Sequence, residues 1–186
     1  MTDLPLAQKV VRLEQALTTR RVPHAFGGAL ALAYYGEPRA TIDIDLNIFV
    51  DADHYEDVMK VLEPLGVARA KDPAAVARDG QTRLWWGRTP VDLFFSYDPV
   101  HDAMRDGTRM VPFSTTTIPI LSPEHLLVAK VVFDRAKDWI DIEQILVAVP
   151  SLNHEEIHHW LERIVGADDR RMARFVALEE ELSGRW

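Results

Sequence analysis

The segment from Thr41 to Val50, TIDIDLNIFV, constrains the fold more than any other part of the sequence. Successive side chains of a strand point to opposite faces of a sheet, so strict alternation is typical of a strand with one buried face. One face of this segment holds Ile42, Ile44, Leu46, Ile48 and Val50, and the other holds Thr41, Asp43, Asp45, Asn47 and Phe49. The pattern therefore predicts a half-buried strand over residues 41–50.

Two carboxylates, Asp43 and Asp45, lie on the polar face of this predicted strand. At the rise of a strand they are about 7 Å apart, and two like charges at that distance repel unless a cation lies between them. Aspartate is also depleted from strands, and Mg²⁺ prefers one or two carboxylates together with substrate phosphates. The pair therefore indicates a magnesium site, with the solvated face of an edge strand as the alternative.

A pair of glycines, Gly27 and Gly28, separates a short predicted strand at residues 22–26 from an Ala/Leu-rich helix predicted over 29–35. Glycines at such a turn let the backbone approach a phosphate, and the start of a helix favours negative charge. A phosphate-binding turn followed by a metal-binding strand suggests nucleotide chemistry, although the glycines alone could form an ordinary turn.

The composition is that of a globular chain, with 186 residues, 47% hydrophobic and 27% charged. There are no cysteines, so disulfides and thiolate metal sites are excluded. No apolar run reaches transmembrane length and no signal-peptide pattern opens the sequence, so we expect a cytoplasmic location without membrane association. The net charge of −8 argues against a surface that coats nucleic acid generally. It leaves room for a local basic patch, for which the candidates are Arg20, Arg21, Arg83, Arg88, Arg135 and Lys137.

The remaining periodicity predicts an α/β fold with a core over residues 1–121 and a helical region over 122–186 packed on that core. Helices are expected at 4–20, 53–65 (with Asp53 as a candidate N-cap), 97–106, 123–133, 139–149 and 168–182. Strands are expected at 83–86 and 91–95, joined by a turn near 87–90, and at 109–113 and 116–121. Residues 67–80 show no clear period. Ser122 and Pro123 are typical of a helix start.

Asp92 is a single carboxylate in the otherwise apolar segment Val91–Phe95. An unpartnered carboxylate buried in a strand would cost free energy, so the residue either caps a loop at the strand end or binds a charged group. We favour a functional role.

In order along the chain, Gly27-Gly28, Ala29, Tyr35-Gly36, Arg39, Thr41 and Asp43-Ile44-Asp45-Leu46 resemble the GG…DxD signature of polymerase-β-type nucleotidyltransferases. The nearest match is to the AbiEii/MenT-like branch, known for toxins of bacterial toxin–antitoxin and phage-defence systems. The resemblance implies a polymerase-β-like core with a small mixed sheet, and Asp92 as a third metal-binding carboxylate beside Asp43 and Asp45. Pro90 stands where that branch often has a lysine, so a phosphate or base contact is missing or comes from elsewhere, with Arg83 or Arg88 as candidates.

The segment PEHLLVAKVVFDRAKDWIDIEQIL resembles the second half of the same pattern, a lysine followed by a basic-acidic cluster. The resemblance implies that Lys130 binds the nucleotide triphosphate. Either Asp138 or Asp141 then acts in catalysis or orients the lysine, and the sequence leaves that choice open. An ordinary surface network one helical turn apart would also explain Lys137 and Asp141.

Taken together, the resemblance implies transfer of a nucleoside monophosphate from an NTP to an acceptor, with Mg²⁺ held by Asp43, Asp45 and Asp92. Gly27, Gly28, Arg39, Thr41 and Lys130 are the expected nucleotide-binding residues, although Arg39 could equally be a solvated arginine. The implied acceptor is RNA, first the 3′ end of tRNA, and the implied partner is a cognate antitoxin protein. Two alternatives remain, namely a small-molecule acceptor of the antibiotic type and a non-catalytic binding module with the same fold.

The sequence from His154 to His158, HEEIH, matches the H-E-x-x-H pattern of zinc metalloproteases. Its context differs, because Asn153 is a candidate N-cap and the motif falls in the first turn of a predicted helix. We therefore expect a helix start here and not a zinc centre.

Overall fold

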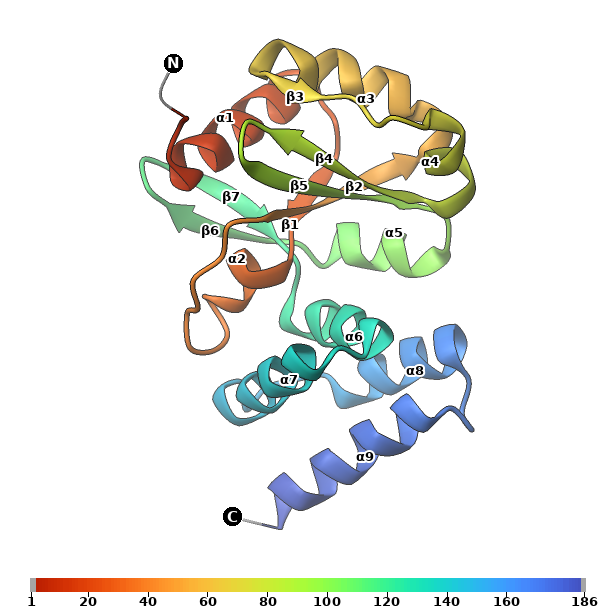
Figure 1. The fold of residues 1–186 in the computed structure, drawn as a ribbon. Coiled ribbons are helices and arrows are strands. Elements are labelled where there is room, and N and C mark those ends of the chain that lie inside the picture. Colours follow the sequence, from red (N-terminus) through yellow and green to blue (C-terminus); the bar gives the residue numbers. More distant parts are fainter. Residues whose placement is uncertain (1–2, 185–186) are drawn as a thin grey trace. The chain divides into compact units, whose positions relative to one another are not determined.

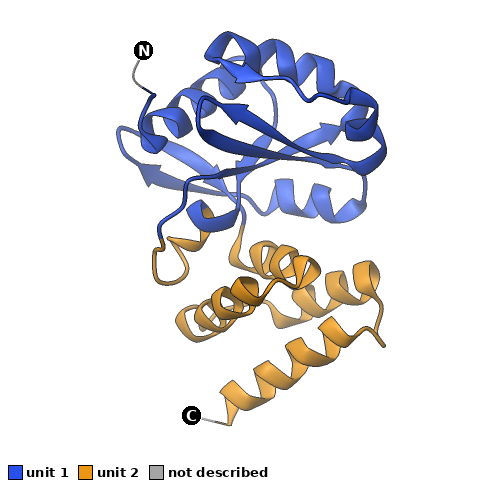
Figure 2. Cartoon of the chain, viewed as in Figure 1, with its two compact units in different colours: residues 1–30, 40–121 blue, residues 31–39, 122–186 orange. Residues whose placement is uncertain are grey.

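The computed structural model describes residues 3–184, which divide into two compact units (Figure 2). The first unit contains the chain up to residue 30 and residues 40–121. The second contains residues 31–39 and the chain from residue 122 onward. The second unit thus includes a short loop from the N-terminal half of the sequence in addition to the C-terminal helices.

A mixed sheet forms the centre of the first unit (Figure 1). Within residues 3–184 it has seven strands in the order β3-β4-β5-β2-β1-β7-β6. The strands are β1 (His24–Phe26), β2 (Ile44–Asp51), β3 (Val67–Ala68), β4 (Gln81–Trp86), β5 (Thr89–Ser96), β6 (Arg109–Phe113) and β7 (Thr116–Ile120). The pairs β2–β5 and β1–β7 are parallel, and the other pairs are antiparallel.

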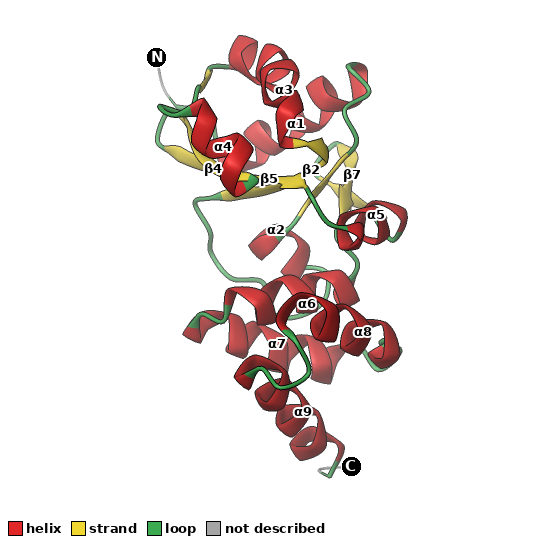
Figure 3. Cartoon of the chain, turned by 90° about the vertical axis from the view of Figure 1, so that its right-hand side faces the viewer, coloured by secondary structure: helices red, strands yellow, loops and turns green. Residues whose placement is uncertain are grey.

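Helices cover both faces of this sheet. In two perpendicular views α1 (Leu6–Thr19), α3 (Tyr55–Leu62) and α4 (Pro73–Asp79) lie over one face and α5 (Pro99–Asp106) over the other (Figures 1 and 3). The helix α2 (Gly28–Leu32) follows β1, and the 3₁₀ turns η1 (Ala52–His54) and η2 (Glu63–Leu65) flank α3. Together with the helical second unit, this arrangement confirms the predicted α/β fold.

The second unit contains four helices of the described chain: α6 (Pro123–Phe133), α7 (Ala136–Ala148), α8 (His154–Val165) and α9 (Arg170–Ser183). The starts of α6 and α8 are capped as the sequence predicts, because Ser122 accepts a hydrogen bond from the backbone of His125 and Asn153 accepts one from Glu156. Asp134 adopts a left-handed conformation with φ 53° and ends α6. No helix within the described residues is both long and apolar enough to span a membrane.

The strand predicted over 41–50 begins later and is more buried than its alternation indicates. Ile44, Leu46 and Ile48 are fully buried as expected, but Ile42 precedes β2 and is 74% exposed. Asn47 and Phe49 of the opposite face are buried as well. The reason is that β2 lies between β1 and β5 in the middle of a sheet covered on both faces.

Several predicted helix boundaries differ from those in the structure. The helix α2 ends at Leu32 instead of Tyr35, because the backbone N–H groups of Tyr34 and Tyr35 bond three residues back and tighten the chain. Asp51, not Asp53, caps the turn before α3. The segment without periodicity, residues 67–80, forms β3 and α4.

Candidate functional site

The parallel pairing of β2 with β5 brings Asp45 and Asp92 side by side. Asp45 is opposite Asp92 in the register, so both side chains project from the same face of adjacent strands. Each is partly exposed, whereas the residues that flank it on its strand, such as Ile44 and Leu93, are buried. The two predicted metal-binding strands therefore present their carboxylates at one place in the first unit.

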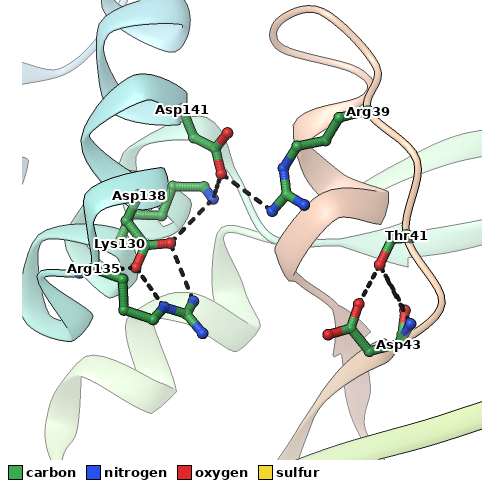
Figure 4. A network of polar contacts seen from close by, with 7 residues as sticks. All are labelled: Arg39, Thr41, Asp43, Lys130, Arg135, Asp138 and Asp141. Carbon is green, nitrogen blue, oxygen red and sulfur yellow. Dashed lines mark hydrogen bonds and ion pairs between the residues drawn. The ribbon is translucent and has the colours of Figure 1, made fainter.

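Asp43 lies just before β2, two residues from Asp45. Its carboxylate accepts a short hydrogen bond from the hydroxyl of Thr41, and its backbone N–H donates to the same hydroxyl at 3.3 Å (Figure 4). Thr41 thus orients Asp43 in this structure. Its predicted contact with a nucleotide stays a prediction.

Arg83 on β4 completes the group of charges around Asp92. The two residues are opposite each other in the antiparallel β4–β5 pair. Arg83 donates from Nε to Oδ1 and from Nη2 to Oδ2 of Asp92, both at 2.7 Å. These hydrogen bonds raise the pKa of Arg83, burial acts in the opposite direction, and the charges of Asp92, Asp43 and Asp45 add to the rise. All three carboxylates therefore act on one guanidinium.

The sequence offers Arg83 as a candidate for replacing the missing phosphate-binding lysine, and that role stays a prediction. In the structure its guanidinium binds Asp92. Sequence reasoning missed the pair, although a signal was present: a two-residue turn at Gly87-Arg88 would place Arg83 opposite Asp92. The predicted turn over 87–90 was too long, so it gave the wrong register.

The backbone of Gly27 and Gly28 approaches Asp45 closely. The N–H of Gly27 donates to the carbonyl of Asp45 at 3.0 Å. Gly28 has φ +52°, and a Cβ built there would lie 1.7 Å from Oδ2 of Asp45. Only glycine can occupy position 28 without moving that carboxylate, since both the space and the backbone conformation exclude a side chain.

The donor set of this group fits a hard divalent cation. Asp43, Asp45 and Asp92 offer carboxylate oxygens, and the absence of a side chain at Gly28 makes room for the carboxylate of Asp45. The guanidinium of Arg83 is itself a cation bound to the same group. In the part of the chain that the structure describes, no three His, Cys, Asp or Glu side chains are gathered closely enough to form a complete metal cage. The carboxylate of Asp92 is turned toward Arg83 instead.

The other predicted site residues belong to the second unit, where Lys130 forms a buried ion pair with Asp141 (Figure 4). Lys130 Nζ lies 2.5 Å from Asp141 Oδ2 and 3.9 Å from Asp138 Oδ1. All three residues are at most 4% exposed. Since buried charges are retained when they are paired, the two carboxylates stabilise the ammonium of Lys130 within the helical unit.

Two arginines complete this cluster. Arg39 Nη2 lies 3.3 Å from Asp141 Oδ2, so Asp141 receives both Lys130 and Arg39. Arg135 binds Asp138 through its side chain at 2.6 Å and through its backbone N–H at 3.2 Å, which makes Asp138 part of the cap of α7. Asp141 is therefore the nearer of the two carboxylates to Lys130, and which of Asp138 and Asp141 has the functional role stays a prediction. Lys137 is exposed at the start of α7.

The H-E-x-x-H sequence has a partner that the sequence does not suggest. His154 Nδ1 and His158 Nε2 each lie 2.6 Å from a different oxygen of Glu179 on α9. The two histidines thus join α8 to α9 through one carboxylate.

The fold and the carboxylate group define a class of protein. The chain has the fold of solved nucleotidyltransferases: it is 17% identical to the antibiotic-resistance factor ANT(2'')-Ia, with a TM-score of 0.60 over 96% of this chain and 97% of that one. It is 18% identical to a putative nucleotidyltransferase from Thermotoga maritima, with a TM-score of 0.52 over 78% and 96% of the two chains. A lincomycin-bound structure of the lincosamide adenylyltransferase LnuA is 16% identical, with a TM-score of 0.53 over 77% and 98%.

Residues 13–183 match the model of the family described as nucleotidyl transferase AbiEii toxin, type IV toxin–antitoxin system. The chain therefore belongs to the AbiEii nucleotidyltransferase toxin family, as the sequence resemblance implies. A comparison with curated proteins finds no match.

Proposed function

We propose that the protein transfers a nucleoside monophosphate from an NTP to an acceptor hydroxyl and releases pyrophosphate. The observation that carries this proposal is the register of β2 and β5, which places Asp45 opposite Asp92. Asp43 precedes Asp45 by two residues, so the three carboxylates lie in the same part of the first unit. Membership of the AbiEii family supports it.

Asp43, Asp45 and Asp92 would hold Mg²⁺, which supplies charge neutralisation at the phosphates and an acidified acceptor hydroxyl. The chain's own groups do the rest. Gly27 and Gly28 would bind the triphosphate through the backbone, because neither carries a side chain of its own at the turn beside Asp45. Thr41 would hold the carboxylate of Asp43 in position. Lys130 and Arg39 are proposed to bind triphosphate oxygens, with Asp141 orienting both cations.

The proposed acceptor is the 3′ end of tRNA, in the cytoplasm, with a cognate antitoxin as the protein partner. The support is the toxin description of the family. Transfer to RNA by a chain of net charge −8 requires a local basic surface. Arg20 and Arg21, both exposed in the first unit, are the proposed contacts.

A small hydroxylated acceptor is the second candidate. Two solved structures with this fold are antibiotic enzymes by name, and one related structure contains adenylyl-2''-tobramycin. The acidic net charge would attract a cationic acceptor of that kind.

One experiment separates the two candidates. The protein is incubated with each of the four labelled NTPs, Mg²⁺, and either total tRNA or a set of aminoglycosides and lincosamides. Labelled tRNA, formed by the wild type and not by Asp45→Ala, is the expected result. Label only in the antibiotic reactions would make the small-molecule acceptor correct. Label in none of them, from folded protein, would contradict the proposed activity.

A further inference from the structure

The ion pair between Arg83 and Asp92 engages both oxygens that Asp92 could offer to a metal. Both carboxylate oxygens accept a hydrogen bond from the guanidinium, each at 2.7 Å. A cation that binds Asp92 must therefore share these oxygens with the guanidinium or displace it, and the two positive charges repel each other. The two side chains differ in how freely they can move, since that of Arg83 is 55% exposed and that of Asp92 only 15%.

Arg83 also offsets part of the negative charge of the acidic group formed by Asp43, Asp45 and Asp92 in the first unit. The charges of Asp43 and Asp45, as well as that of Asp92, act favourably on its guanidinium. A second positive charge entering the group would be repelled by Arg83 for the same reason. Because the side chain of Arg83 is far more exposed than that of Asp92, Arg83 is the partner that can move away into solvent.

We propose that Arg83 competes with the divalent cation for Asp92, so that metal binding is coupled to release of the Arg83 side chain. This inference rests on the proposed function of the carboxylate group. Arg83 is a positioning residue: it neutralises Asp92 before the metal arrives and raises the metal concentration that the site requires. The exchange is non-covalent, and the released guanidinium keeps its charge.

Binding of Mn²⁺ to the NTP-free protein, followed by the electron paramagnetic resonance signal of the free ion, tests the proposal without any turnover. Arg83→Gln removes the competing ion pair. The free energy of a partly exposed ion pair corresponds to about a three- to fivefold change in affinity. We therefore expect Arg83→Gln to bind Mn²⁺ about three- to fivefold more tightly than the wild type. Arg83→Lys, which keeps the charge but loses the two-pronged contact, should fall between them.

Arg88→Gln is the matched control, because Arg88 lies in the turn of the same hairpin and its loss changes the net charge equally. Screening should leave the Mn²⁺ affinity of this variant close to that of the wild type. In an Asp92→Asn background, Arg83→Gln should have a smaller effect on Mn²⁺ affinity, because the ion pair is already broken and only the repulsion from the Arg83 charge remains. Mn²⁺ should also raise the thermal midpoint of Arg83→Gln more than that of the wild type, which shows that the variant is folded.

Equal or weaker Mn²⁺ binding by Arg83→Gln would overturn the proposal, as would an equal gain in Arg88→Gln. Absence of binding in both the wild type and Arg83→Gln would also count against it, because removal of Arg83 should then uncover a site. Failure of nucleotidyl transfer with the expected Mn²⁺ result would instead contradict the proposed function alone.

Discussion

At the scale of single residues, each carboxylate of the acidic group in the first unit has a neighbour that the fold places beside it. Thr41 binds Asp43, Gly28 leaves space for Asp45, and Arg83 binds Asp92. Each of these contacts fixes one carboxylate against the repulsion of the other two.

The first prediction concerns Asp45. Asp45→Ala should lower product formation by at least about 10³-fold, because several kcal/mol of charge stabilisation in the transition state depend on the metal carboxylates. The variant should still fold, since it removes one of three like charges and leaves the Arg83–Asp92 pair intact. The measurements are single-turnover transfer and the thermal midpoint, with Asp57→Ala on the exposed face of α3 as the control. Transfer near the wild-type rate would contradict the site assignment.

The second prediction concerns the buried His125 in the second unit. Burial lowers the pKa of His125, although the charges of Glu156 and Glu124 act in the other direction. Its Nδ1 is 3.0 Å from Ser122 Oγ, while Nε2 lies 3.3 Å from Glu156 Oε1 without the geometry of a hydrogen bond. The unfolded chain therefore binds a proton near pH 6.5 that the folded chain does not, and stability falls as the pH decreases through that value.

Urea unfolding at pH 7.5 and 5.5 measures this effect. The free energy of unfolding should decrease between the two values in the wild type and decrease less in His125→Gln. A smaller decrease should remain, because burial lowers the pKa of His101 as well. An identical decrease in both proteins would show that His125 does not contribute.

At the scale of elements, a buried lysine joins the first helix to the hairpin that carries the acidic group. Lys9 on α1 is fully buried, and its ammonium donates to the carbonyl of Trp86 at 2.7 Å and to Oγ1 of Thr89 at 2.8 Å. Asp3 lies 2.6 Å from the same nitrogen. These contacts hold the turn between β4 and β5, and so support the register that pairs Arg83 with Asp92.

The third prediction follows from this contact. Lys9→Met should lower the free energy of unfolding by about 1–3 kcal/mol, because it leaves buried acceptors without a donor. Lys60→Met on α3 removes an ion pair between exposed side chains and should cost less than about 1 kcal/mol. Urea denaturation of both variants gives the comparison, and equal losses would mean that the Lys9 contacts contribute little.

The fourth prediction concerns the contact between α8 and α9. Replacing His154 and His158 together by alanine should leave nucleotidyl transfer and metal content unchanged, because both histidines bind Glu179. The unfolding free energy should decrease by about 1–2 kcal/mol, since both contacts are partly solvated. Stoichiometric zinc in the wild type that disappears in the double variant would instead identify HEEIH as a metal site.

At the scale of the whole molecule, the net negative charge of the protein repels an RNA acceptor. A chain of net charge −8 that binds tRNA should do so through a few phosphate contacts, each of which releases counterions. A cationic small acceptor would depend on salt in a different way, because it carries no phosphates.

The fifth prediction is therefore a steep loss of apparent affinity for tRNA with rising salt. Replacing Arg20 and Arg21 by glutamate should reduce the logarithmic salt slope by about one to two and raise the KM for tRNA much more than that for NTP. Lys60→Glu with Arg78→Glu gives the same charge change at exposed helical positions and should leave the slope unchanged. Arg83 is unsuitable for this test, because it binds Asp92. A KM for tRNA that ignores both salt and the Arg20/Arg21 change would contradict RNA binding at these residues.

The sequence by itself determined the features that depend on neighbours a few residues apart. The alternation around Asp43 and Asp45, the glycine pair, the caps at Ser122 and Asn153, and the mixture of strands and helices all follow from local periodicity and backbone preference. The family signature falls in these local segments, which is why the fold class and the family were predictable.

Only the tertiary structure decided which distant side chains meet. The two-residue turn set the pairing of Arg83 with Asp92. The packing of α6 against α7 places Asp141 closer to Lys130 than Asp138. Glu179 was brought to His154 and His158 from a helix about twenty residues further along the chain. Such contacts depend on strand register and helix packing, where a shift of one residue changes every partner, and the periodicity that predicts helices and strands does not by itself fix them.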